Sequence, residues 1–341
     1  MTNQAPPGPP PPAQLLQILT SKWVSQAIGV VAELNIADHV ASGPKTAAEL
    51  ATLTNSHERS LYRMLRTTAS VGVFSEDAEG RFGLTPMAEL LRSDVPGSMR
   101  AAAVCLNMDA MWRPYGHIAY SVKTGKSAFE HVYKSNAFQY FREHPEEAKV
   151  FNAGLVNFAS LSAGPLAVAY DFSRFTKLVD VGGGQGFLLA AILKANPSLK
   201  GVVFDQPAVI EQAKPLLKKE GVDDRAEAIG GDFFESVPGG GDVYTIKSCL
   251  HDWDDDNVVR ILKVIRKSMP STATLLLIES LVPKGNDPHF SKLSDVEMLV
   301  LAGGIERRDD EWRDLLAKGG FTPTRTIATR GPVSIIEATP A

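Results

Sequence analysis

The chain has 341 residues, of which 44% are hydrophobic, and 35 Lys and Arg against 39 Asp and Glu give a net charge of −4. This length suggests about two domains, and the slightly acidic balance argues against a dedicated nucleic-acid-binding protein. No uninterrupted apolar run approaches the roughly 18 residues of a membrane span, and the N-terminus shows no secretory signal pattern. Two cysteines, Cys105 and Cys249, offer neither a disulfide framework nor a zinc-binding pair. We therefore expect a cytoplasmic enzyme or binding protein without membrane or nucleic-acid partners.

The first 13 residues form the most unusual segment by composition. They include six prolines and no apolar periodicity. Such a segment is typical of a disordered, polyproline-type tail. A ligand for a domain that binds proline-rich peptides is the less favoured interpretation.

Residues 14–100 are expected to form a helical domain. Apolar residues in segment 15–40 recur at three- and four-residue intervals, as in a buried helix. Segment 46–74 predicts two further helices, and segment 74–85 reads as a hairpin. Helix, turn, helix and hairpin is the order of a winged helix.

Winged helices often bind DNA, so DNA binding is one possible role of this domain and dimerisation is the other. The second helix offers Arg59, Arg63 and Arg66. The wing carries acidic residues, among them Asp77 and Glu79, which phosphates would repel. Dimerisation is the favoured role.

From about residue 171 onward, short β-type runs alternate with helical stretches. This alternation predicts a mostly parallel sheet with helices on both faces, an α/β Rossmann-like fold whose ligands bind at the carboxyl ends of the strands. The expected strands are 177–181, 201–205, 225–229, 242–247, 274–280 and 333–338, and the expected helices are 187–195, 208–219, 255–268 and 308–320.

A glycine-rich loop follows the first of these strands. Asp180, Gly182, Gly184 and Gly186 form the pattern D-x-G-x-G-x-G, and Asp205 ends the next strand. Glycines let a ligand approach the backbone, and a carboxylate at the second strand suits the hydroxyls of a ribose. The third glycine of the nicotinamide-type G-x-G-x-x-G pattern is missing, which favours S-adenosylmethionine over NAD.

Two later strand ends add polar groups. Asp232 and Phe233 follow the third strand and could hold an adenine ring by its amine and its face. Lys247 ends the fourth strand, where it would point at the cofactor or pair with a carboxylate. Both assignments depend on the glycine loop beside them.

His251 is the candidate for chemistry because it follows the end of a central strand, beside the inferred cofactor site. Glu279 ends the next strand, and Glu306 follows a Gly-Gly pair. Two carboxylates beside a histidine would fix its tautomer and stabilise its protonated form.

The motifs LVDVGGGQG, VVFDQP, GGDFF, IKSCLHDW, LIESLVP and LAGGIERRDDEW occur in this order. In this respect the chain resembles the plant-type (family 2) O-methyltransferases, such as the caffeic acid, flavonoid and N-acetylserotonin enzymes and their bacterial counterparts. The resemblance covers the chain from about residue 14 onward. It implies a winged-helix dimerisation domain at 14–100, a helical bridge that binds substrate at 101–170 and a Rossmann-like catalytic domain at 171–341. It also implies a homodimer in which the N-terminal half of one subunit reaches the other subunit's active site.

The resemblance assigns roles to individual residues. His251 would be the general base, flanked by Glu279 and Glu306, with no metal. The cofactor S-adenosylmethionine would be held by Asp180, Gly182, Gly184, Asp205, Gln206, Asp232, Phe233, Lys247 and Ser248. An aromatic substrate would contact Met108, Trp112, Tyr115, Phe151, Leu155, Asp252 and Met298, with Met111, Phe138 and Phe158 as further candidates. The family's serine before the glycine loop meets Ala159 here, with Ser160 adjacent.

The expected reaction is methyl transfer from S-adenosylmethionine to a phenolic hydroxyl in secondary metabolism, leaving S-adenosylhomocysteine. One rival is an enzyme of the same fold that uses the cofactor for hydroxylation or a pericyclic step. The other is a ligand-sensing winged-helix DNA-binding protein. The sequence identifies neither the acceptor nor its position of methylation.

Overall fold

A computed structural model describes residues 9–341 as two compact units. The N-terminal unit comprises the described residues up to Trp112 together with Glu146–Asn157. The C-terminal unit comprises Arg113–Pro145 and Phe158–Ala341. Helix α11 (Pro145–Ala169) supplies residues to both units, so the expected segment 101–170 divides between them.

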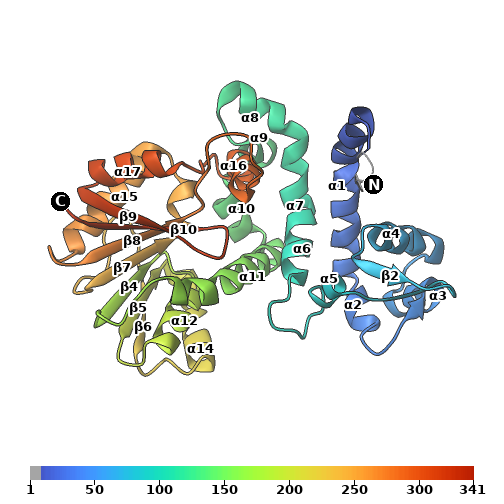
Figure 1. Cartoon of the computed structure of the whole chain (residues 1–341), viewed down its shortest axis with the longest axis horizontal. Coiled ribbons are helices and arrows are strands. Elements are labelled where there is room, and N and C mark those ends of the chain that lie inside the picture. The colour runs from blue at the N-terminus through green and yellow to red at the C-terminus, as the bar shows by residue number, and fades with distance from the viewer. Residues whose placement is uncertain (1–8) are drawn as a thin grey trace, which may run out of the picture. The chain divides into compact units, whose positions relative to one another are not determined.

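The N-terminal unit has the predicted order of helices and a winged hairpin (Figure 1). Three short strands form a sheet in the order β1-β3-β2, in which all pairs are antiparallel. Thr46 and Glu49 form a capping box that starts α3, as the side chain of each accepts from the other's backbone N–H. The elements are α1 (Pro11–Glu33), α2 (Ile36–His39), β1 (Lys45–Thr46), α3 (Ala47–Thr54), α4 (Glu58–Ser70), β2 (Phe74–Glu76), β3 (Arg81–Leu84), α5 (Pro86–Glu89), α6 (Arg100–Asn107) and α7 (Asp109–Trp112).

The boundary expected at residue 13 is corrected by helix α1, which begins at Pro11. Proline is tolerated in a first helical turn because the N–H that it lacks would have no partner there. Residues 11–13 are therefore helical, while residues 1–8 of the expected tail lie outside the described residues.

Helices α1 and α11 are long and apolar enough, by length and composition, to cross a membrane. Neither helix contains a long uninterrupted apolar run, so the sequence analysis did not identify them as long and apolar enough to cross a membrane. This property is weak evidence for a span, because an apolar helix of a soluble protein passes the same test. Most of α1 is exposed within the single chain, including its large apolar side chains Leu15, Leu16, Ile18, Leu19 and Trp23.

The C-terminal unit is built on a seven-stranded sheet in the order β6-β5-β4-β7-β8-β10-β9 (Figure 1). The first five strands are parallel, whereas β10 pairs with β8 and β9 in antiparallel fashion. This confirms the predicted Rossmann-like methyltransferase architecture. The strands are β4 (Lys177–Val181), β5 (Lys200–Asp205), β6 (Ala226–Gly230), β7 (Val243–Lys247), β8 (Thr274–Glu279), β9 (Phe321–Ala328) and β10 (Ser334–Pro340).

Alternating side chains of the sheet serve two separate cores. Leu276 and Ile278 of β8 pack in a core with α12 and α14, and Leu275 and Leu277 pack in a core with α15 and α17. The two faces are both covered, which is why the strands read as continuous apolar runs. The remaining elements are η1 (Arg113–His117), α8 (Ile118–Thr124), α9 (Ala128–Tyr133), α10 (Ala137–Glu143), α12 (Phe187–Ala195), α13 (Pro207–Ile210), α14 (Ala213–Lys219), η2 (Leu250–Asp252), α15 (Asp255–Ser268), α16 (Phe290–Leu301) and α17 (Asp309–Lys318).

Three elements differ from the sequence analysis. The helix expected at 208–219 is divided into α13 and α14. Strand β9 at the sheet edge and helix α16 were not predicted. Helix α16 matters most, because it contacts the candidate site described below.

Asp242 ties the start of β4 to the start of β7. Its carboxylate accepts hydrogen bonds from the N–H and hydroxyl of Thr176 and from the N–H of Lys177, at 2.7–2.9 Å. Burial opposes ionisation, but these bonds outweigh it and lower the pKa of Asp242.

We expect Asp242→Ala to lower the free energy of unfolding by about 2 kcal/mol, measured by urea denaturation. Asp224→Ala, which removes a carboxylate that is 76% exposed, is the control and should change stability little.

Candidate active site

The glycine loop after β4 adopts the conformation that its composition predicts. Gly182, Gly184 and Gly186 all have positive φ, at 65°, 60° and 87°. A Cβ on Gly183 would lie 2.6 Å from Asp180 Oδ2, so a side chain does not fit there, whereas nothing lies within 4 Å of the corresponding point at Gly184. The loop therefore packs against β4 on one side and leaves open backbone on the other.

Asp205 at the end of β5 holds this loop. One carboxylate oxygen accepts the N–H of Gly184 at 2.8 Å and the other accepts the N–H of Gln206 at 2.7 Å. Burial raises the pKa of Asp205 against the lowering effect of these bonds. The carboxylate predicted to bind ribose is thus fixed in orientation by the loop beside it.

Asp180 and Lys247 are buried charged groups under the loop. Asp180 is 1% exposed, and its Oδ1 accepts the hydroxyl proton of Thr245 at 2.7 Å. Its Oδ2 is buried without a hydrogen-bond partner in the described residues. Burial raises the pKa of Asp180 to about 6 and lowers that of Lys247, while each charge favours ionisation of the other.

The predicted adenine contacts lie beside an aromatic cluster. Asp232 accepts the N–H of Phe234 at 2.8 Å and so shapes its own turn. The ring of Phe233 lies within 3.9 Å of the point where a Gly182 Cβ would be, which brings the third strand end next to the glycine loop. Phe233 also contacts Phe234 and Trp253 edgewise or at a tilt.

The turn after β7 carries His251 and is held by Glu279. Ser248 has φ of +47°, a left-handed conformation that is uncommon outside glycine, Asn and Asp. Glu279 Oε1 accepts the N–H groups of Cys249 and Leu250 at 3.2 and 3.0 Å. One carboxylate from β8 therefore fixes the path of the chain that leads to the histidine.

His251 lies among three carboxylates. Its Nδ1 is 3.2 Å from Glu306 Oε1 and 3.5 Å from Glu279 Oε2, and its Nε2 is 3.7 Å from Asp252 Oδ1. The side chains of Glu279 and Glu306 are 0% and 2% exposed, whereas that of His251 is 15% exposed. The two glutamates are thus buried, whereas the ring between them and the solvent is partly exposed.

These charges shift the titration of the cluster. Burial lowers the pKa of His251, but the charges of Glu279, Glu306 and Asp252 outweigh it and raise that pKa to about 10. Burial raises the pKa of Glu279 to about 7, although His251 opposes the rise. The cluster therefore stabilises the protonated imidazole strongly.

The predicted substrate contacts divide between the two units. Tyr115, Asp252 and Met298 belong to the C-terminal unit, and Tyr115 donates its hydroxyl proton to Glu297 of α16. The further candidates Phe138 and Phe158 also belong to the C-terminal unit. The remaining candidates belong to the N-terminal unit, namely Met108, Met111, Trp112, Phe151 and Leu155.

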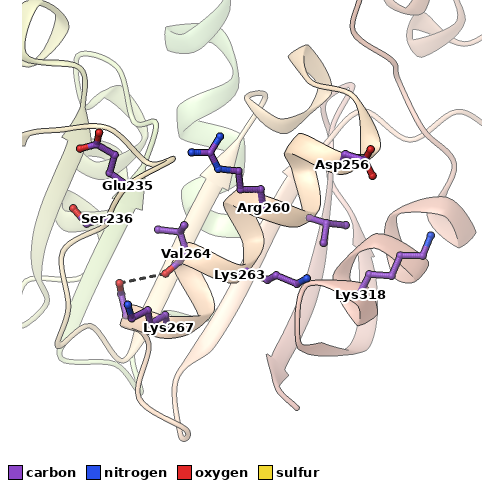
Figure 2. Close-up of a pocket in the computed structure, with 10 residues that line it drawn as sticks. Glu235, Ser236, Asp256, Arg260, Lys263, Val264, Lys267 and Lys318 are labelled. Atoms are coloured by element: carbon purple, nitrogen blue, oxygen red, sulfur yellow. Dashed lines mark hydrogen bonds between the residues drawn. The ribbon is translucent and has the colours of Figure 1, made fainter.

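A groove elsewhere on the C-terminal unit has a volume of about 960 Å³ and contains none of the predicted site residues (Figure 2). It is bordered by the cations Arg260, Lys263, Lys267 and Lys318. The cationic side chains at its border are exposed. This groove contains no buried titratable group and is distinct from the cluster around His251.

Sequence reasoning missed several residues of the site. Thr245 lies within a β-strand pattern that does not mark it as a site residue. Its hydrogen bond to Asp180 places it in the site. Ser294 and Asp295 of α16 contact Glu306 by side chain and backbone. The i, i+3 and i+4 spacing of a helix over 290–301 was the signal that could have placed them near the site.

Comparisons with known proteins agree with this geometry. The chain matches the model of the O-methyltransferase domain over residues 115–322 and that of the O-methyltransferase dimerisation domain over residues 16–94. It is 44% identical over 326 residues to a phenazine O-methyltransferase of Lysobacter antibioticus, covering 96% of this chain and 95% of that protein. It is 39% identical to a mitomycin biosynthesis 6-O-methyltransferase of Streptomyces lavendulae, covering 94% and 92%.

A solved structure shows the same fold with ligands. It is an O-methyltransferase from neocarzinostatin biosynthesis in complex with S-adenosylmethionine and 2-hydroxy-5-methyl naphthoic acid. The TM-score is 0.78 at 33% identity, covering 93% of this chain and 96% of that one.

Asp205 generates a prediction about nucleoside binding. Asp205→Ala should weaken the binding of S-adenosylhomocysteine about 10- to 150-fold, since it removes charge-assisted bonds to the ribose and frees the N–H of Gly184. Isothermal titration calorimetry measures the change. Asp223→Ala, at an exposed position on the same unit, is the control, and unchanged affinity in Asp205→Ala would mean that the ribose contact lies elsewhere.

Proposed function

The chain belongs to the O-methyltransferase family, and from this premise we propose that it methylates a phenolic hydroxyl of an aromatic small molecule, with His251 as general base. The observation that carries the proposal is the position of His251, backed by two buried glutamates at the carboxyl end of the sheet. The family uses S-adenosylmethionine, and relatives with solved structures bind it or its product. The rival reactions of the same fold have no comparable support from this site.

The residues at the strand ends fit this cofactor. The open backbone at Gly184 suits the amino-acid portion, the fixed carboxylate of Asp205 suits the ribose diol, and Phe233 suits the adenine face. The unpartnered Oδ2 of Asp180 leaves one buried acceptor for a cationic or donor group. When bound, the cofactor supplies an activated methyl group, so the protein has to align the acceptor and remove its proton.

His251 is suited to take that proton. With Nδ1–H directed at the glutamates, Nε2 is left as the acceptor on the opposite side of the ring. A phenol has an ordinary pKa near 10, so a histidine of ordinary pKa near 6.5 would face an uphill transfer of about 5 kcal/mol. The carboxylates reduce this cost because they raise the pKa of His251 to about 10.

The acceptor class is proposed from the relatives. The names of these relatives specify a phenazine, an aminohydroxybenzoate and a dihydroxynaphthoate, all flat aromatic molecules. One relative is an N,N-dimethyltransferase, so nitrogen methylation is the second candidate. Met298 and Tyr115 are the substrate contacts proposed within the C-terminal unit. The absence of a metal and a cytoplasmic location stay predictions.

The role of His251 is tested by its removal. His251→Ala should lower methyl transfer about 10²-fold or more at neutral pH, because a positioned base is lost. Binding of S-adenosylhomocysteine should stay nearly unchanged, since the nucleoside contacts lie on other strand ends. Transfer of radiolabelled methyl to a panel of phenols, hydroxynaphthoates and hydroxyphenazines measures the activity.

The pH dependence gives an independent check of the same assignment. His251 has to be neutral to accept a proton, so kcat/KM in the wild type should rise with pH through its raised pKa. The loss in His251→Ala should shrink toward the pKa of the phenol, where the acceptor ionises by itself. Near-normal turnover of His251→Ala at neutral pH would show that proximity alone carries the reaction.

We also propose a homodimer formed through the N-terminal unit. Ile18, Leu19 and Trp23 are 70%, 61% and 65% exposed on helix α1, which is more apolar surface than a monomer usually leaves in water. The match to the dimerisation domain covers this helix from residue 16. A second copy of the chain is therefore the partner that would cover it.

The dimer is tested by placing a charge on this surface. Ile18→Glu should shift the mass measured by light scattering at micromolar concentration from dimer to monomer, because a carboxylate would be buried in the interface. Gln17→Glu introduces the same charge at the neighbouring exposed polar position and is the matched control. A wild-type monomer would contradict the proposal.

A further inference from the structure

Two consecutive residues of helix α16 hold the glutamate that faces His251. Ser294 Oγ lies 2.9 Å from Glu306 Oε1, and Asp295 Oδ1 accepts the backbone N–H of Glu306 at 2.9 Å. The loop between α16 and Glu306 is joined to the histidine as well, since the N–H of Ile305 donates to the carbonyl of His251 at 2.8 Å. Backbone and side chain of Glu306 are thus both positioned.

The hydroxyl of Ser294 contacts the same oxygen that faces the imidazole. His251 Nδ1 is 3.2 Å from Glu306 Oε1, so this one oxygen lies between a hydroxyl and a ring nitrogen. The alternative acceptor for Ser294 is the carbonyl of Ser291 at 3.3 Å, which is longer and uncharged. A hydroxyl donates preferentially to the nearer, charged oxygen.

This arrangement decides which ring nitrogen carries the proton. When Ser294 donates to Oε1, that oxygen acts as an acceptor, and His251 Nδ1 has to supply the second donated proton. Nε2 then keeps its lone pair for the acceptor molecule. If Oε1 turned away from the ring, Nδ1–H would lose its charged acceptor, and the other tautomer, in which Nε2 carries the proton and cannot act as a base, would be populated.

Few donors hold the side chain of Glu306 in place. Glu279 receives two backbone N–H groups, whereas among the described residues the carboxylate of Glu306 has hydrogen bonds only with Ser294 and His251. The titratable and charged groups around the pair are Asp180, Asp205, Lys247, Cys249 and Asp252 near β7 and η2, Glu279 on β8, Asp295 and Glu297 on α16, and Arg307 and Glu311 after it.

We propose that Ser294 is a positioning residue that keeps Glu306 Oε1 directed at Nδ1 of His251 and thereby holds His251 in the tautomer with Nε2 free. The inference rests on the proposed role of His251 as base and extends it to a residue outside the motifs of the sequence. Ser294 acts only through Glu306.

A pair of variants of equal shape tests this role. Ser294→Thr keeps the hydroxyl and Ser294→Val lacks it, while both are β-branched and have similar volume. In Ser294→Val, kcat should fall about 10-fold, the lower end of the effect of one hydrogen bond to a charged group. The acid limb of the kcat/KM profile should move down by about one pH unit, since a Glu306 carboxylate that is no longer held against the ring stabilises the imidazolium less. Ser294→Thr should resemble the wild type in both.

Two further measurements separate positioning from a loss of structure. Long-range ¹H–¹⁵N NMR of histidine-labelled protein, recorded above the pKa of His251, should show Nδ1–H in the wild type and Ser294→Thr, and an Nε2–H fraction in Ser294→Val. Affinity for S-adenosylhomocysteine and KM for S-adenosylmethionine should stay within about twofold in all variants. Ser268→Ala removes a hydroxyl that donates to the carbonyl of Val264 in its own helix, and it is the control.

The outcomes distinguish the two proposals. If Ser294→Val and Ser294→Thr have the same kcat, pH profile and tautomer, the positioning role is wrong, whatever His251 does. If His251→Ala retains turnover, the general base is wrong, and the tautomer measurement still decides what Ser294 does to the ring. A uniform loss of kcat in both variants without a pH shift would mean that only packing at position 294 matters.

Discussion

Carboxylates removed from water around one histidine are the constraint on which the candidate site depends. Burying an ionised carboxylate is costly unless hydrogen bonds and an opposite charge compensate it. Glu279 is compensated by two backbone N–H groups and by His251, and Glu306 by Ser294 and His251. Removal of the imidazole would take away the cation that the two acids share. The fold around this site therefore has to bring donors from the turn after β7 and from helix α16 to the same place.

The parallel sheet makes this delivery possible. The carboxyl ends of β4, β5, β7 and β8 meet at one edge, so Asp180, Asp205, Lys247 and Glu279 come together although they are far apart in the chain. The left-handed Ser248 then turns the chain after β7, where the N–H groups of the next two residues reach Glu279. The left-handed conformation of Ser248 and the candidate catalytic residue His251 thus both follow the end of β7.

The sequence predicted those parts of the site that can be identified from short patterns of neighbouring residues. Short apolar runs followed by Gly, Asp or His located the parallel strands and the residues at their ends, and the family resemblance supplied their roles. The contacts of Glu279 with residues about 30 positions away and of Glu306 with α16 depend on tertiary packing, which no local pattern encodes. Helix α16 has apolar residues at helical spacing, but the polar residues between them weaken that signal, and the edge strand β9 was missed because five of its eight residues are exposed. The short neutral hydroxyl of Ser294 gave no chemical signal at all.

Gly304 sets a limit on redesign of this enzyme by loop exchange. A Cβ at this position would lie 2.2 Å from the carbonyl oxygen of His251, a distance that no side chain tolerates. Segments grafted between α16 and Glu306 to widen the range of acceptors would have to cross the histidine's backbone with glycine at this one point. Libraries that randomise this loop would therefore lose most of their members to displacement of His251 rather than to poor recognition of a new acceptor.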